Sequence, residues 1–436
     1  MTLMPLIAVI ALGQAQPAKL TMDEAVKIGA TNAFSVRQAQ NRLDKAAYNQ
    51  KASRNALGPS LSVGGNWAYQ KLDFANSNSG SGQGQFGVDG TSKSVSATLT
   101  QPIDISGLIH LAATVLDEQT MVARAALRAE ENSVRSRVKT KFLNVLQASE
   151  LVDVQVAALK ANKDRLEKAQ VKWREGAIAR FEVLRFETEV KKSEQSLIEA
   201  KSNLSLAKQD LNNTIGREAE VDFEAVPVAN VPTDIPTVDV LVRQSLSTRQ
   251  EVKQAEASVV AADSTKKLTW RSLRPSLNLS LSQTNYIDPA TSSTKAQTLA
   301  AINLTVPIYD SGVTRLNVQA AQRDVDYAEI AVEQTKLGVS LETQSAYTSA
   351  KTALEAIDVA KQNVKLTEEA LRLAQIRYDQ TVGILLDVTT AQSDLTAARA
   401  SLVIANYKYY QAYAALQKAV GSETLGATAP TKETSK

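Results

Sequence analysis

The chain contains two copies of one long pattern at a constant spacing. Three pairs of landmarks, each 205 positions apart (307 − 102 for the first), are Pro102 and Pro307, Trp173 and Tyr378, and Gly216 and Gly421. A constant offset over this length indicates a duplicated unit, in which each copy supplies part of a shared surface. The repeat by itself does not suggest catalysis.

The composition is typical of long helices. The 436 residues include only 18 Gly and 11 Pro, aromatic residues make up 5%, and Ala, Gln, Lys, Glu and Leu dominate. The 49 basic and 46 acidic residues are interspersed, which does not point to a nucleic-acid partner. The absence of Cys excludes thiolate metal sites, and the single His110 cannot build a His-rich metal site. We therefore expect no metal, no cofactor and no catalytic residues.

The organisation along the chain follows from its breaks. We predict a signal peptide over 1–15, a first repeat over 16–216, a linker over 217–237, a second repeat over 238–421 and a disordered tail over 422–436. The leader has an apolar stretch from Leu3 to Leu12 followed by small residues, but it lacks Lys and Arg, so a misassigned start codon is the alternative. Beyond Leu12 no stretch approaches the ~20 apolar residues of a spanning helix, so we expect any membrane insertion to use β-strands.

Each repeat is predicted to hold three long helices. The expected spans are about 21–57, 107–173 and 181–215 in the first copy, and 238–273, 312–378 and 386–420 in the second. Thr21 and Glu24 form a capping box at the first helix start. At 1.5 Å per residue the central helix of each copy would be on the order of 100 Å long. Val138, Phe142 and Val145 begin one heptad stripe and Leu151 and Val154 a second, which suits helices with neighbours on both sides.

Four strands alternate apolar and polar residues. They are predicted at about 60–73, 92–102, 276–287 and 297–307, with Trp67, Tyr69, Phe74 and Tyr286 near strand ends as interfacial aromatics. Four strands cannot close a transmembrane barrel, so the strands would be pooled between chains, giving eight from two subunits or twelve from three. The alternative is a pair of edge strands in a small soluble sheet.

These features resemble the TolC-like outer-membrane efflux proteins from about Thr21 to Gly421. The resemblance rests on the duplicated helix–strand–strand–helix plan, on Leu57–Leu61 and Leu273–Leu277 before the first strand of each copy, and on Pro102–Gly107 and Pro307–Gly312 after the second. It implies a mainly α fold with a small β part. A homotrimer would form a 12-stranded β-barrel in the outer-membrane lipid that continues into a long periplasmic α-helical barrel. It also implies an exit duct for efflux or type I secretion, working with a periplasmic adaptor and an inner-membrane pump.

The resemblance also assigns a periplasmic tip and a pore constriction. The tip that contacts the adaptor maps to Gly176, Ala177 and Ile178 in the first copy and to Val382, Gly383 and Ile384 in the second. The constriction maps to Glu182, Asp387 and Tyr378. Thr381 replaces the usual tip glycine, Gly383 stands where an arginine can latch the closed state, and Thr390 replaces a second acidic residue. These departures weaken the case for a latch, while a single acidic ring per trimer would still favour cations.

Simpler interpretations of the acidic residues, the heptads and the leader also remain open from the sequence. Glu182 and Asp387 also suit the first turn of a helix, where the dipole favours a carboxylate by about 0.3–1 kcal/mol. The heptads and leader also suit a secreted or surface coiled-coil scaffold without a pore, although such a scaffold has no need for matched amphipathic strands. An enzyme finds no support, because the sequence contains no GxSxG, P-loop or HExxH motif.

Overall fold

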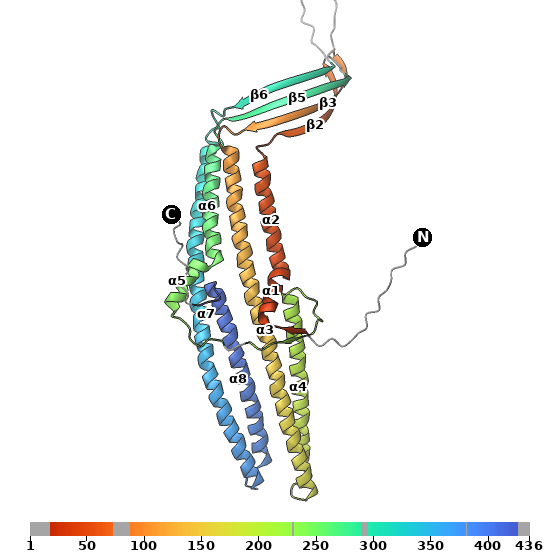
Figure 1. Cartoon of the computed structure of the whole chain (residues 1–436), viewed down its shortest axis with the longest axis vertical. Helices are drawn as coiled ribbons and strands as arrows, with labels where there is room; N and C mark the ends of the chain where they lie inside the picture. The colour runs from red at the N-terminus through yellow and green to blue at the C-terminus, as the bar shows by residue number, and fades with distance from the viewer. Residues whose placement is uncertain (1–17, 73–87, 229–230, 289–294, 381, 426–436) are drawn as a thin grey trace, which may run out of the picture. The chain divides into compact units, whose positions relative to one another are not determined.

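A computed structural model describes residues 18–72, 88–228, 231–288, 295–380 and 382–425. The predicted signal peptide, Phe74 and residues 426–436 of the predicted tail lie outside the described residues. The chain divides into two compact units, one formed by 1–41, 125–253 and 334–436, the other by 42–124 and 254–333. Helices α3 and α7 run through both units (Figure 1).

The elements follow the same order in both repeats. The first repeat contains β1 (Ala18–Leu20), α1 (Met22–Asn32), α2 (Phe34–Asn55), β2 (Ser60–Leu72), β3 (Val88–Ile103), α3 (Leu108–Arg174) and α4 (Arg180–Thr214). Next come β4 (Phe223–Ala225), α5 (Val238–Thr248), α6 (Gln250–Arg271), β5 (Ser276–Asp288), β6 (Ala296–Thr305), α7 (Val313–Asp379) and α8 (Leu385–Val420). The segment 217–237, expected as a linker, includes β4, which pairs in parallel with β1.

The second unit holds a four-stranded antiparallel sheet in the order β2-β3-β5-β6 (Figure 1). The register aligns Leu61 with Leu99, and Leu99 with Leu281, so these apolar residues share one face. Ser62, Thr98 and Ser282 align in the same way on the other face. The alternation predicted from the sequence is therefore confirmed, and it gives one apolar and one polar face.

The apolar face of the sheet is not covered by the residues that the structure describes. Leu61 is 70% exposed, Val63 72% and Ile302 73%. Tyr286, expected as an interfacial aromatic, lies near the end of β5; it aligns with Ser94 on the polar face, and its hydroxyl donates to Gln297 Oε1 at 3.3 Å.

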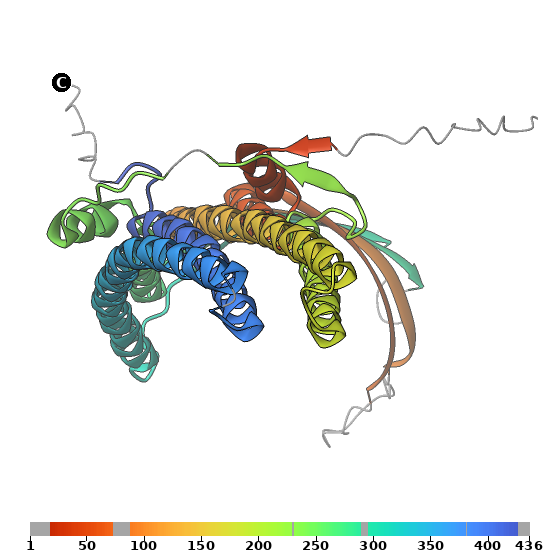
Figure 2. The same ribbon diagram turned by 90° about the horizontal axis from the view of Figure 1, so that it is seen from below.

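The long helices form two antiparallel pairs in the first unit. Figures 1 and 2 both show α4 beside α3 and α8 beside α7. The predicted stripe on α3 is buried at Val138, Phe142 and Val145, but Val156 and Trp173 remain 46% and 40% exposed. The described residues therefore cover these two side chains only in part.

Helix α3 also departs from one expectation about hydropathy. It contains an 18-residue window with mean hydropathy 1.2 and no more than two charged residues, long and apolar enough to cross a membrane by composition alone. The sequence analysis anticipated no such stretch. Two apolar stripes on one helix raise its mean hydropathy, because residues facing neighbours on both sides are counted together.

The first helix of each repeat is broken, which the sequence analysis did not anticipate. The capping box at its start is present: Glu24 N donates to Thr21 Oγ1 at 3.3 Å, and Thr21 N donates to Glu24 Oε2 at 3.0 Å. The helix then stops at Ala33, whose ψ of 132° ends α1 before α2 begins. In the second repeat the same break falls at Arg249, with ψ 131°. Neither break contains Gly or Pro, so no local breaker marked it.

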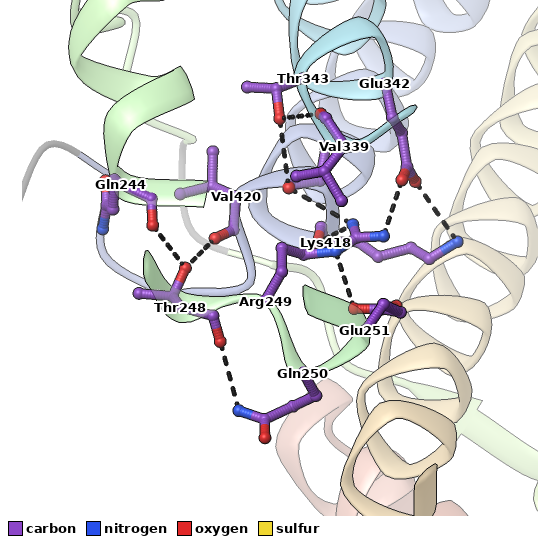
Figure 3. Close-up of polar contacts among 11 residues, drawn as sticks. Gln244, Thr248, Arg249, Gln250, Glu251, Val339, Glu342, Thr343, Lys418 and Val420 are labelled. Carbon is purple, nitrogen blue, oxygen red and sulfur yellow. Dashed lines mark hydrogen bonds and ion pairs between the residues drawn. The ribbon is translucent and has the colours of Figure 1, made fainter. Parts of the chain in front are cut away.

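Arg249 joins three helices at its break (Figure 3). Its Nη1 donates to the Lys418 and Ala419 carbonyl oxygens at 3.0 and 3.3 Å, which caps the end of α8. Its Nη2 and Nε contact the carboxylates of Glu342 on α7 and Glu251 on α6, at 2.7 and 2.9 Å. The Arg249 side chain is only 8% exposed, so this cluster, hereafter the Arg249 clamp, is a nearly buried ionic joint.

Candidate functional site

The turn between α3 and α4 is built on Gly176. Its φ of +73° lies in the left-handed region, where a residue without Cβ is favoured. Its N–H donates to Trp173 O at 3.0 Å, and the Ala177 N–H donates to Lys172 O at 2.8 Å, which is the Schellman ending of a helix. Ile178 packs against the buried cluster of Ala169, Phe186 and Leu385. The first predicted tip is thus a compact turn with Gly176 and Ala177 exposed.

The turn between α7 and α8 is built differently. The N–H groups of Val382 and Gly383 both donate to Arg377 O, at 3.0 and 2.9 Å. A Cβ on Gly383 would approach the Cβ of Arg377 at 3.0 Å, so a close backbone approach favours glycine here. Val382 and Ile384 are 72% and 61% exposed. Thr381 lies outside the described residues.

Two of the three predicted constriction residues meet beside these turns. Tyr378, in the last turn of α7, donates its hydroxyl to Glu182 Oε2 in the first turn of α4 at 2.5 Å. The ring of Tyr378 packs against the two buried clusters that contain Leu385 and Val388. Burial, followed by the hydrogen bond to Glu182, raises the pKa of Tyr378, which keeps its hydroxyl protonated as a donor.

Asp387 does not join this pair. It is exposed in the first turn of α8, and its carboxylate makes no hydrogen bond or ion pair with any residue the structure describes. Its position suits an interaction with the helix N-terminus, which is the simpler interpretation that the sequence analysis left open. The structure therefore brings Glu182 and Tyr378 together and leaves Asp387 outside their contact.

A second link between the repeats was missed from the sequence. Lys172 Nζ lies 2.9 Å from Asp379 Oδ1, and it also lies 5.3 Å from the centre of the Tyr378 ring, within cation–π range. At the position of Asp379 in the first repeat, 205 residues earlier, stands Arg174. The two paired residues themselves do not stand at equivalent positions, so the repeat gave no signal for this pair.

The two links border a cavity of about 610 Å³ in the first unit. Its wall includes Lys172, Tyr378 and Asp379, together with apolar Ala169 and Phe186. The pair Tyr378–Glu182 and the pair Lys172–Asp379, hereafter the tip links, join α3 and α4 of one repeat to α7 of the other. Because the links are polar and only partly buried, a change of charge or a competing partner would loosen them more easily than an apolar core.

Comparisons with known proteins show the family and the fold. The family model described as outer membrane efflux protein matches residues 29–217 and 241–422. Nodulation protein T of Rhizobium leguminosarum bv. trifolii is 25% identical over 91% of this chain and 84% of its own length. Outer membrane protein TolC of Escherichia coli (strain K12) is 22% identical over 87% of this chain and 78% of its own. The Campylobacter jejuni CmeC outer membrane channel has a TM-score of 0.74 at 17% identity, covering 92% of this chain and 85% of that one.

Proposed function

Because the chain belongs to the outer membrane efflux protein family, and is an outer-membrane efflux channel that extends into the periplasm, we propose that it is the exit duct of a tripartite efflux or type I secretion system. In this role it conducts passively whatever an inner-membrane pump and a periplasmic adaptor deliver. The observation that carries the proposal is the four-stranded sheet with one exposed apolar face and two unpaired edges.

The sheet edges support a homotrimer. Among the described residues β2 pairs only with β3, and β6 only with β5. Inside lipid every backbone N–H and C=O needs a partner, so β2 of one copy must pair with β6 of another. Three copies supply twelve strands, which lies within the range of natural barrels. The apolar faces then contact outer-membrane lipid, and the polar faces line the lumen.

An exposed apolar stripe on α7 also supports association between copies. Leu337, Leu341, Val359 and Leu366 are between 68% and 74% exposed, and their spacings of 4, 18 and 7 residues keep them on one helix face. Exposed apolar rows of this length mark interaction surfaces. In a trimer a neighbouring copy would cover this stripe and complete the helical barrel.

We place the pore constriction at the tip links. Glu182 and Tyr378 lie where α4 begins and α7 ends, beside the turns that close each helix pair. Three copies of Glu182, joined by three of Asp387, would gather negative charge on a narrow axis and favour cations. The exposed Val382 and Ile384, with Gly176, Ala177, Ile178 and Gly383, form the surface offered to the adaptor.

Planar-bilayer recordings test the duct and its constriction together. The full chain is expected to insert and conduct in discrete, cation-preferring steps. Glu182→Ala combined with Asp387→Ala should weaken the cation preference, because it removes the charge on the axis. Absence of any conductance would favour the scaffold without a pore. Unchanged conductance and selectivity in the double variant would show that these carboxylates only start their helices.

A further inference from the structure

Arg165 on α3 is a partly buried cation without a carboxylate partner. Its Nη1 donates to Asn162 Oδ1 at 3.1 Å, and its Nη2 donates to Gln392 Oε1 at 2.5 Å. Both acceptors are neutral amides, and no Asp or Glu within the described residues lies in ion-pair distance of the guanidinium. Burial lowers the pKa of Arg165, and only the adjacent Asp164 opposes that effect. A cation held in this way is incompletely compensated.

The surroundings of Arg165 form a polar cavity of about 240 Å³ between α3, α4 and α8. Buried Ser193 and Gln392 line it, and both are held in place: Asn162 Nδ2 donates to Ser193 Oγ at 2.7 Å, and Gln392 Nε2 donates to Thr396 Oγ1 at 3.2 Å. The wall is therefore fixed by a hydrogen-bonded network and is not a loose surface cleft.

The charge around the cavity favours an anion. Two of the five N–H donors of a guanidinium are used by the amides, and Arg165 lines the cavity with the others. The one carboxylate in the wall, that of Glu189, is paired with Lys192 at 2.9 Å. With these two cancelling, Arg165 leaves one net positive charge facing the cavity.

The repeat shows that a helix pair of the α3–α4 kind can form without this arginine. The position equivalent to Arg165, 205 residues later, is Ala370, and the position equivalent to Gln392, 205 residues earlier, is Glu187. The same helix pair therefore forms in the second repeat without a guanidinium. A partly buried arginine without a carboxylate partner, present in only one copy, favours a role in binding a ligand.

We propose that the cavity between α3, α4 and α8 binds a small oxyanion, such as sulfate, phosphate or a free carboxylate, through Arg165. A planar guanidinium with free N–H groups is suited to bidentate contact with such an anion. The Lys192 ammonium lies in the same wall and supplies a further donor. Arg165 also lines the neighbouring cavity that the tip links border, but binding of an anion does not require conduction.

Thermal unfolding of the full chain in detergent tests the site with sulfate as the probe. At matched ionic strength, replacing chloride by about 10 mM sulfate is expected to raise the apparent Tm of the wild type by about 2 °C more than that of Arg165→Gln. Arg128→Gln, an exposed arginine on the same helix, should respond like the wild type and controls for net charge. An equal response in Arg165→Gln, or no sulfate response in the wild type, would overturn the proposal.

If Arg165→Gln fails to fold, crystals of the wild type grown with selenate test whether an oxyanion binds at Arg165. An anomalous selenium peak within hydrogen-bonding distance of the Arg165 guanidinium supports the site. A cavity without such a peak, or one filled by a carboxylate from a neighbouring copy, overturns it.

Discussion

Combining Tyr378→Phe with Lys172→Gln is expected to raise the open fraction of the channel by about tenfold or more. The first change removes a hydrogen bond to a charged group, of about 1.5–3 kcal/mol, and the second an exposed ion pair of about 0.2–1 kcal/mol. Because each 1.4 kcal/mol shifts an equilibrium about tenfold, losing both tip links should favour separation of the repeats. Single-channel recordings measure this as longer or larger open events.

Tyr407→Phe is the matched control for loss of the tip links. The Tyr407 hydroxyl on α8 donates to Glu150 on α3 at 2.6 Å, which is also a tyrosine–glutamate hydrogen bond between the repeats. Both residues lie away from the ends of their helices and therefore away from the tip. Loss of this hydrogen bond should lower stability without changing conductance. If Tyr407→Phe opened the channel as much as the tip variant, or if the tip variant left conductance unchanged, the tip links would not be what holds the channel closed.

Replacing Arg249 with methionine is expected to cost about 3 kcal/mol of stability. The change leaves the carboxylate of Glu251 without its cation, leaves Glu342 with only the longer pair to Lys418 at 3.8 Å, and removes the donors to the last carbonyls of α8. The expected loss lies at the lower end for a broken buried pair, because both carboxylates are 40% exposed. Thermal unfolding of the variant in detergent measures it.

Two variants separate the Arg249 clamp from a general charge effect. Arg372→Met removes an exposed pair within one helix, with Glu369, and should cost less than about 1 kcal/mol. Adding Glu251→Gln to Arg249→Met should restore part of the loss, since Glu251 forms no other ion pair with the described residues. Equal losses for Arg249→Met and Arg372→Met would contradict the assigned role of the clamp.

The repeat made most of the fold predictable. The constant offset located both 67-residue helices to within about two residues, and the strict alternation of Leu61 and Val63 with Ser60 and Ser62 identified the faces of the sheet. These signals are periodic and extend over many residues. The broken first helices were missed because Ala33 and Arg249 carry no local breaker, and the break depends on packing against other helices.

The candidate site was only partly predictable. Resemblance supplied Glu182 and Tyr378, which the structure joins, and also Asp387, which it leaves without a described partner. Lys172 and Arg165 were missed, because their roles depend on residues more than 200 positions away, Asp379 and Gln392. Helix periodicity tells which residues share a face, but it does not tell which face of a distant helix lies opposite.

The mass of the full chain extracted from outer membranes in detergent tests most directly whether copies pool their strands. Native mass spectrometry is expected to find three copies in one particle, because β2 and β6 each need a partner from another chain. A single copy in the detergent particle, or a chain that stays soluble without detergent, would contradict the shared barrel.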